Sequence, residues 1–277
     1  MPPRQRVPAL TSAPGEGPSP EQLLRHGEVS VLGRIVSASN ATLLVEVALD
    51  GAVARAVYKP VRGERPLWDF PHGTLADREV ATHLVSEALG WGTVPLTVMR
   101  EEAPFGRGSI QLWVEEREDD ALVDVVAPDA VPEGWWTVLE AEGVAGEPVL
   151  LCHADVPGLR RTAVLDVVVN NADRKGGHVL HALDGGVRGV DHGLTFHVED
   201  KLRTVLWGWA GEPLAGEDRV AVEQLLGRLG GALGDSLATH LRDEEVAATL
   251  ERACALLESG EMPGPGGRWP AIPWPAF

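Results

Sequence analysis

A chain of 277 residues with 44% hydrophobic and 23% charged residues has an ordinary globular composition, long enough for one large domain or two lobes. Its net charge of −17 argues against nucleic acids and anionic membrane surfaces as partners, because both would repel it. The two cysteines are too few for a disulfide framework, and no secretion signal or membrane-spanning run is evident, so we expect a cytoplasmic protein.

Lysine is scarce in this chain. Three lysines, Lys59, Lys175 and Lys201, stand against 21 arginines, a bias typical of GC-rich genomes such as those of actinobacteria. Where arginine replaces lysine so thoroughly, a remaining lysine suggests a site that needs a compact point charge. For Lys201 we expect only a solvated surface position, whereas the context of Lys59 favours a functional role.

The N-terminal part is predicted to be a disordered tail followed by a strand-rich lobe. Residues 1–20 are rich in proline and poor in apolar anchors, which is typical of disorder. We place the lobe at residues 21–118, beginning with a short helical segment. Five strands are predicted in it, at residues 29–36, 42–47, 54–59, 94–99 and 109–114.

The turn between the first two predicted strands carries Ser37, Ser39 and Asn40. Its hydroxyl and backbone N–H groups could cover the phosphates of a nucleotide. A plain hairpin turn explains the same residues equally well, so the turn is only a candidate binding segment.

Lys59 ends the third predicted strand, and a helix is predicted from Leu75 to Leu89, before Gly90. A lysine on a strand and a glutamate such as Glu79 on the next helix can form an ion pair that positions phosphates. The alternative is that Glu79 is a solvated helix charge, as helix glutamates usually are.

A run of charged residues from Glu115 to Asp120 separates the first lobe from a C-terminal lobe, which we place at residues 119–259. In a two-lobed nucleotide-binding protein the base would lie against this linker, so Val114 and Glu115 are candidates for binding it. Residues 121–158 show no clear pattern, and the two tryptophans within them are expected to pack rather than to bind.

The most informative stretch runs from Asn170 to Gly193. Its Asp-Gly-Gly sequence between two short apolar runs predicts a β-hairpin. A hairpin brings its two ends together, so Asp173, His178 and Asp191 would meet at one end. One acid can then face a substrate hydroxyl while the other, with His178, holds a divalent metal, which is the layout that phosphoryl transfer needs.

The segment after this hairpin, residues 194–211, is expected to face the substrate. Its tryptophans either line a pocket or pack between the lobes, and packing is favoured. Helices are predicted near residues 219–233, 236–241 and 243–258. Residues 260–277 are rich in proline, glycine and tryptophan and are predicted to form an irregular tail along the surface.

The order of these elements resembles a protein-kinase-like fold, and in detail the phosphatidylinositol 3-/4-kinase-like catalytic domain in a reduced bacterial form. That family carries Asp-Arg-His-x-x-Asn, a short hairpin and Asp-Phe-Gly. This chain has Asp-Arg-Lys-Gly-Gly-His at residues 173–178, a hairpin, and Asp-His-Gly at residues 191–193. The resemblance spans roughly residues 28–209. It implies an α+β, two-lobed fold with a strand-rich N-lobe, one key helix in that lobe and a reduced helical C-lobe.

The resemblance also implies roles for individual residues. Asp173 would be the catalytic acid facing the acceptor hydroxyl, with Arg174 and Lys175 beside it, and Asp191 would chelate a metal. Lys59 and Glu79 would be the phosphate-positioning pair. His178 stands where the family has asparagine, and imidazole suits Mn²⁺ better than the oxygen-preferring Mg²⁺. ATP with Mg²⁺ or Mn²⁺ is therefore the expected cofactor set.

We therefore expect an ATP- and metal-dependent phosphotransferase that modifies a hydroxyl of a soluble protein or small molecule. Lys59, Arg174 and the metal would offset the charge of the triphosphate. Two alternatives stay open: a nucleotide-binding, pseudokinase-like module, which His178 would favour, and a nucleotidyl (AMP) transferase on the same fold. A further possibility is an ordinary α+β protein in which the acidic hairpin is coincidental.

Overall fold

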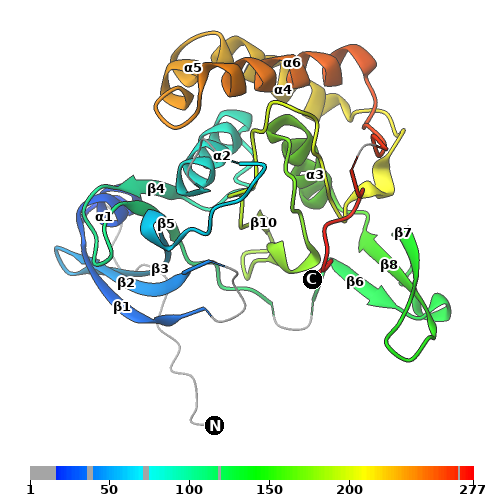
Figure 1. The fold of residues 1–277 in the computed structure, drawn as a ribbon, viewed down its shortest axis with the longest axis horizontal. Helices are drawn as coiled ribbons and strands as arrows, with labels where there is room; N and C mark the ends of the chain where they lie inside the picture. Colours follow the sequence, from blue (N-terminus) through cyan, green and yellow to red (C-terminus); the bar gives the residue numbers. More distant parts are fainter. Residues whose placement is uncertain (1–16, 36–39, 71–74, 118–119, 268) are drawn as a thin grey trace. The chain divides into compact units, whose positions relative to one another are not determined.

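The computed structural model describes residues 17–35, 40–70, 75–117, 120–267 and 269–277 (Figure 1). Most of the predicted tail and the candidate residues Ser37 and Ser39 lie outside these ranges. The chain divides into two compact units. The first holds Met1–Leu67 and Leu96–Trp113, and the second holds Trp68–Pro95 and Val114–Phe277. The helix carrying Glu79 groups with the second unit, whereas the boundaries drawn from the sequence assign it to the first lobe.

The first unit is built on a five-stranded antiparallel sheet in the order β1-β2-β3-β5-β4. Its strands are β1 (Glu28–Arg34), β2 (Leu43–Leu49), β3 (Ala52–Pro60), β4 (Thr97–Arg100) and β5 (Gly108–Leu112). Asp50 and Gly51 both have positive φ in the turn between β2 and β3, as a tight two-residue hairpin turn requires. The Asp-Gly dipeptide therefore fixes the pairing of these two strands.

The core of the first unit lies on one face of this sheet. Helix α1 (Pro20–His26), whose first turn is capped by Ser19, contributes Leu23 and Leu24 to it. In β3 alternate side chains are buried, and Tyr58 belongs to the core. Because successive side chains on a strand point to opposite faces, Lys59 projects from the other face of the sheet.

The second unit contains the longer helices and two small antiparallel sheets. The helices are α2 (Leu75–Leu89), α3 (Pro157–Val169), α4 (Gly216–Leu229), α5 (Ala232–Leu237) and α6 (Asp243–Ser259). One sheet, in the order β6-β8-β7, joins β6 (Val123–Val126), β8 (Pro148–Ala154) and β7 (Trp135–Glu142). The other is the hairpin of β9 (Val179–His181) and β10 (Val187–Gly189). Short 3-10 turns are present at Val61–Gly63, Pro128–Ala130, Gly176–His178 and Trp207–Trp209.

The α+β fold class is confirmed, with a strand-rich first unit and a second unit that holds most of the helices. The hairpin predicted from Asp184-Gly185-Gly186 is also confirmed. Trp135 and Trp136 pack against the core of the second unit, as expected, and Trp209 is buried within it. The stretch at 121–158, which has no clear pattern in sequence, folds into the β6-β8-β7 sheet. Within the described ranges, no helix combines the length and apolar character needed to cross a bilayer.

Candidate active site

The polar loop before the hairpin begins where α3 ends. Asn170 adopts the left-handed conformation that ends many helices, and asparagine tolerates it better than most residues. Its side-chain amide donates to the carbonyls of His197 (2.8 Å) and Glu199 (2.6 Å), and its Oδ1 accepts from the backbone N–H of Lys201 (2.9 Å). The end of α3 thus also holds the segment that follows the hairpin.

A fully buried ion pair shapes this loop. Arg174 donates from Nε to Asp166 Oδ2 and from Nη2 to Asp166 Oδ1, both at 2.8 Å, and both residues are 0% exposed. The same guanidinium donates to the carbonyls of His178 (3.2 Å) and Val190 (3.0 Å). Arg174 therefore ties α3 to both ends of the hairpin.

This geometry corrects the expectation that Arg174 offsets the charge of a triphosphate. Its guanidinium has no exposed surface and is directed at Asp166 and hairpin carbonyls. Asp166 is not among the predicted site residues, although a single acid inside the apolar run Ala163–Val169 is a signal for a buried functional or structural charge. Asn171 was missed as well. It donates to Asp166 Oδ1 (2.9 Å) and accepts from the backbone N–H of Asp173 (3.0 Å).

Asp173 is held at the start of the loop beside Lys175, whose Nζ lies 3.6 Å from Asp173 Oδ2. Burial raises the pKa of Asp173 to about 6, with Lys175 opposing the rise and the nearby Asp191 adding to it. A carboxylate with a pKa near neutrality can accept a proton from a hydroxyl and release it again. This is the property expected of a general base.

His178 and Asp191 lie together at the end of the hairpin, as predicted. His178 Nδ1 is 3.0 Å from the carbonyl oxygen of Asp173, and a carbonyl only accepts, so Nδ1 carries the proton. In the neutral form of the ring Nε2 is then an electron-pair donor, and it lies 3.4 Å from Asp191 Oδ2. Two electron-rich atoms facing each other at this distance can share a cation or a proton.

Glu79 of α2 lies near His192 at the end of the hairpin. Arg174 Nη2 donates to His192 Nε2 (2.7 Å), so the neutral ring carries its proton on Nδ1, which is 4.0 Å from Glu79 Oε2. Glu79 is 2% exposed, so its interpretation as a solvated helix charge is wrong. Lys59 belongs to the first unit, and its pairing with Glu79 stays a prediction.

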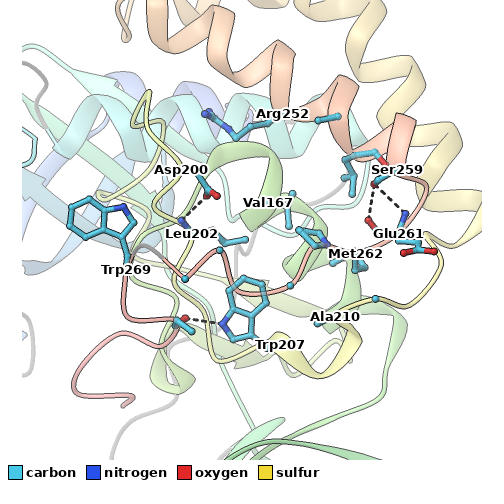
Figure 2. A pocket seen from close by; sticks show the side chains of 18 of the residues that line it. Val167, Asp200, Leu202, Trp207, Ala210, Arg252, Ser259, Glu261, Met262 and Trp269 are labelled. Carbon is cyan, nitrogen blue, oxygen red and sulfur yellow. Dashed lines mark hydrogen bonds between the residues drawn. The ribbon is translucent and has the colours of Figure 1, made fainter.

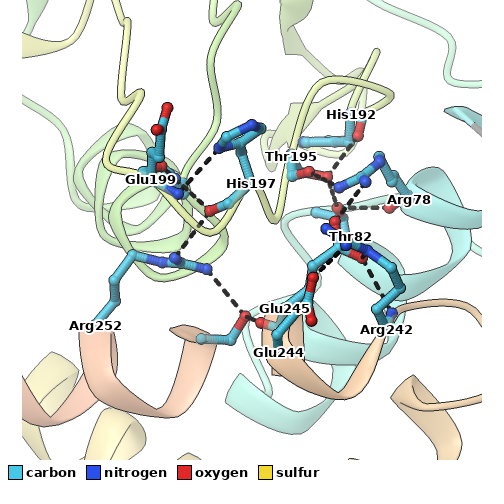
Figure 3. Close-up of polar contacts among 12 residues, drawn as sticks. Arg78, Thr82, His192, Thr195, His197, Glu199, Arg242, Glu244, Glu245 and Arg252 are labelled. Carbon is cyan, nitrogen blue, oxygen red and sulfur yellow. Dashed lines mark hydrogen bonds and ion pairs between the residues drawn. The ribbon is translucent and has the colours of Figure 1, made fainter. Parts of the chain in front are cut away.

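A buried polar network fixes the segment after the hairpin to two helices (Figure 3). Arg78 of α2 forms an ion pair with Glu245 at the start of α6 (2.6 Å) and donates to the carbonyl of Thr195. Arg252 of α6 donates to the carbonyl of His197 (3.2 Å). Residues 192–199 are therefore held by buried charges rather than only by backbone pairing.

The linker is attached to the hairpin by backbone hydrogen bonds. The N–H of Leu183 donates to the carbonyl of Glu115 (2.9 Å), and the N–H of Arg117 donates to the carbonyl of His181 (2.9 Å). Val114 begins the part of the linker that belongs to the second unit.

In the first unit, Asn40 Oδ1 accepts from the backbone N–H of Arg65 (3.1 Å). Binding of a nucleotide by Asn40, Val114 or Glu115 stays a prediction.

The C-terminal residues pack against the polar loop. The N–H of Gly176 donates to the carbonyl of Ala276 (2.8 Å), and a Cβ placed on Gly176 would lie 2.1 Å from the ring of Phe277. A larger residue at position 176 would require this ring to move. Residues 261–267 and 269–271, together with α6 and residues 198–211, line a cavity of about 850 Å³ (Figure 2). Trp207 and Trp269 line it, so Trp207 contributes to a cavity wall as well as to packing.

Lys201 is buried, so its predicted solvated position is wrong. It is 2% exposed, and its Nζ lies 4.3 Å from the ring centre of Trp269 and 5.0 Å from that of Trp68. Asp69 Oδ2 lies 3.5 Å from the same Nζ. The burial arises because two tryptophans distant in sequence cover the lysine, and a carboxylate balances its charge.

Replacing Lys201 by methionine is expected to lower the free energy of unfolding by about 1–2 kcal/mol, because a desolvated cation–π contact and an ion pair are lost. Thermal unfolding monitored by tryptophan fluorescence would measure the change. Lys201→Arg, which keeps the charge and can stack on indole rings, is the matched control and should lose less. Equal losses in both variants would contradict a role for the cation.

Together these elements define an α+β protein with a buried Asp–Arg pair beneath a hairpin that carries two acids and a histidine. No family model matches the chain. It is 52% identical over 264 residues to Protein Rv2133c of Mycobacterium tuberculosis, covering 92% of this chain and 94% of that protein, and it belongs to the family of Protein Rv2133c. Among solved structures it is similar to the Helicobacter pylori proinflammatory kinase CtkA, with a TM-score of 0.45 and 9% identity over 86% of this chain and 94% of that one.

Proposed function

We propose that this chain is an ATP- and divalent-metal-dependent phosphotransferase of a kinase-like, phosphatidylinositol 3-/4-kinase-like type, acting on a hydroxyl of a soluble protein or small molecule. The observation that carries the proposal is the meeting of Asp173, His178 and Asp191 at one end of the hairpin. Asp173 has a pKa of about 6, and His178 Nε2 lies 3.4 Å from Asp191 Oδ2. A proton acceptor beside a cation-binding pair is the arrangement that phosphoryl transfer uses.

In this proposal Asp173 accepts the proton of the attacking hydroxyl. Its raised pKa suits this role near neutral pH, since the carboxylate is both present and basic enough. Lys175, with its Nζ 3.6 Å from the same carboxylate, keeps Asp173 partly ionised and can approach the transferred phosphoryl group. Arg174 positions the loop without touching substrate, because its guanidinium is used within the protein.

The donor set fits a divalent cation. In the neutral form of its ring His178 Nε2 carries an electron pair 3.4 Å from Asp191 Oδ2, and one imidazole with one carboxylate suits Mn²⁺ and is acceptable to Mg²⁺. In the described part of the chain, no cluster of three or more His, Cys, Asp or Glu side chains could hold a metal. Phosphate oxygens and water would therefore complete the coordination. When bound, the cation would neutralise charge on the phosphates.

The first test is a thermal-shift measurement with ATP and Mg²⁺ or Mn²⁺ on the wild type and on Asp191→Asn. We expect metal-dependent stabilisation by ATP of the wild type only, because Asp191→Asn removes the charged ligand; at a ligand concentration of about 100 Kd the stabilisation is about 2.7 kcal/mol. Asp184→Asn, in the hairpin turn at its other end, is the matched control and should behave as the wild type.

Mass measurement of the incubated protein and acceptors separates the remaining possibilities. Addition of phosphate supports phosphotransfer, and addition of AMP supports nucleotidyl transfer. Stabilisation without transfer to any acceptor favours a nucleotide-binding module. His178→Asn is expected to shift the metal preference from Mn²⁺ toward Mg²⁺, and an unchanged preference would count against His178 as a ligand. No stabilisation of the wild type by any nucleotide with either metal would overturn the proposed function.

A further inference from the structure

The β6-β8-β7 sheet has two dissimilar faces. Residues paired across antiparallel strands point to the same face, and this register places an apolar row from three strands together. The row's residues are Val123, Val125, Trp136, Leu139, Ala141, Val149, Leu151 and His153. The opposite face carries Asp124, Glu140 and Glu142 together with apolar residues such as Val126 and Leu150. The charged side chains of the strands therefore lie on one face of the sheet.

The apolar face is covered at its base and at Leu151 of the central strand. Val123, Leu151 and Trp136 pack in or against the core of the second unit. In the same row as Leu151, on the two edge strands, Val125 remains 42% exposed and Leu139 46% exposed. Figure 1 shows β7 and β8 extending away from helices α4–α6 of the same unit. The partly exposed apolar surface of the two edge strands at Val125 and Leu139, on either side of the covered Leu151, is called the outer sheet face.

The segment that forms this sheet carries charge of one sign. From residue 118 to residue 159 the sequence contains ten aspartates and glutamates and no lysine or arginine. Asp124, Glu140 and Glu142 are exposed on the sheet itself. Such an edge repels nucleic acid and anionic lipid, and it would repel the same face of a second copy. It is complementary to a basic protein segment.

The sheet also offers backbone for pairing. In the order β6-β8-β7, both β6 and β7 are edge strands, and each pairs on one side with β8. An extended peptide can add to such an edge, with alternate side chains meeting the apolar face. We propose that the outer sheet face docks a protein partner whose strand alternates apolar residues with lysine or arginine.

The base of the sheet reaches the segment that follows the candidate active site. His153 Nε2 accepts from the N–H of Gly208 (3.0 Å), and its ring lies 4.4 Å from that of Trp209. A Cβ on Gly208 would lie 2.4 Å from Trp136 Cβ, so the contact is close. A partner bound to the outer sheet face would therefore be attached to the same compact unit as residues 207–209. The inference does not depend on the proposed phosphotransfer.

The test uses the full chain and a fluorescent short peptide of alternating valine and lysine, with binding followed by anisotropy at low and physiological salt. Tight binding that weakens with salt is expected for the wild type. Val125→Ser with Leu139→Ser, and separately Glu140→Lys with Glu142→Lys, should each weaken binding roughly tenfold or more, because they remove the apolar centre or the charge. These side chains are exposed, and unchanged thermal unfolding would verify the fold.

Matched controls keep the test specific. Val220 on α4 is 50% exposed and Glu258 on α6 is exposed, so Val220→Ser with Glu258→Lys makes similar changes elsewhere and should leave binding unchanged. The valine–lysine peptide should bind more tightly than a serine–lysine peptide and far more tightly than a valine–glutamate peptide. Equal binding of the three peptides, or no effect of the sheet variants, would overturn the proposal. Sedimentation showing a wild-type dimer that Leu139→Ser dissociates would do the same.

Discussion

Asp166→Asn is expected to lower the free energy of unfolding by about 3–5 kcal/mol, because it leaves the Arg174 guanidinium buried without a counter-charge. Both side chains are 0% exposed and share two hydrogen bonds of 2.8 Å. The substitution keeps the size of the side chain, so the loss comes from charge and hydrogen bonding rather than from a cavity. Urea unfolding followed by circular dichroism would measure it, since the midpoint falls with stability.

Asp218→Asn is the matched control for this prediction. Asp218 is 3% exposed, and burial raises its pKa although Arg161 opposes the rise. Asp218→Asn removes a buried charge whose partner, Arg161, is partly exposed and stays hydrated. We therefore expect the free energy of unfolding to fall by less than about 1 kcal/mol. A double-mutant cycle of Asp166→Asn with Arg174→Met should give a coupling of about 2 kcal/mol. Additive losses would show that the two side chains act independently.

Asp173→Asn is expected to reduce ATP hydrolysis, in which water stands in for the acceptor hydroxyl, by roughly 10²–10⁴-fold, because it removes the proposed general base. The wild-type rate should fall as the pH drops below about 6, where Asp173 gains its proton. Steady-state release of phosphate would measure both effects. A pH profile without a break near 6, or a variant as active as the wild type, would contradict the role of Asp173.

The same substitution should stabilise the folded protein. The folded pKa of Asp173 is raised from 3.8 to about 6, mainly by burial, so between these values the folded state holds more protons than the unfolded state. Wild-type stability contributed by this group therefore falls as the pH rises from about 4 to 6, and the penalty of about 1–3 kcal/mol is constant above that range. Asp173→Asn avoids this penalty of burying a charge. The Tm of the variant should therefore exceed that of the wild type by more at pH 8 than at pH 5.

Glu245→Gln is the control with the opposite sign. Burial alone would raise the pKa of Glu245, but the charge of Arg78 and hydrogen bonds from the Arg242 backbone and Arg78 lower it overall. Its ionisation thus stabilises the fold above the unfolded pKa, and this contribution is lost as the pH falls. The glutamine variant should be less stable than the wild type at pH 8. Both variants changing stability in the same direction at pH 8 would contradict the electrostatic explanation.

Local patterns in the sequence account for much of the fold. The Asp184-Gly185-Gly186 turn predicts a hairpin because few other residues adopt the required backbone angles, and that hairpin is present. Asp173 and His178 precede this hairpin and Asp191 follows it. The predicted hairpin therefore also predicts that these three side chains lie close together. Residues 121–158 were not predictable in this way, because their alternation is interrupted by turns and by a bulge between Thr137 and Leu139.

The sequence by itself determined the strand-rich first part, the acidic hairpin and the grouping of Asp173, His178 and Asp191, since each follows from spacing within a short stretch. Only the tertiary structure decided that Arg174 is a buried positioning residue, that Glu79 lies near His192, and that Lys201 lies between two tryptophans. The physical reason is distance along the chain: Lys201 meets Asp69 across 132 residues, and Arg78 meets Glu245 across 167. Such partners share no local periodicity, and burial of a charge depends on which distant side chains cover it.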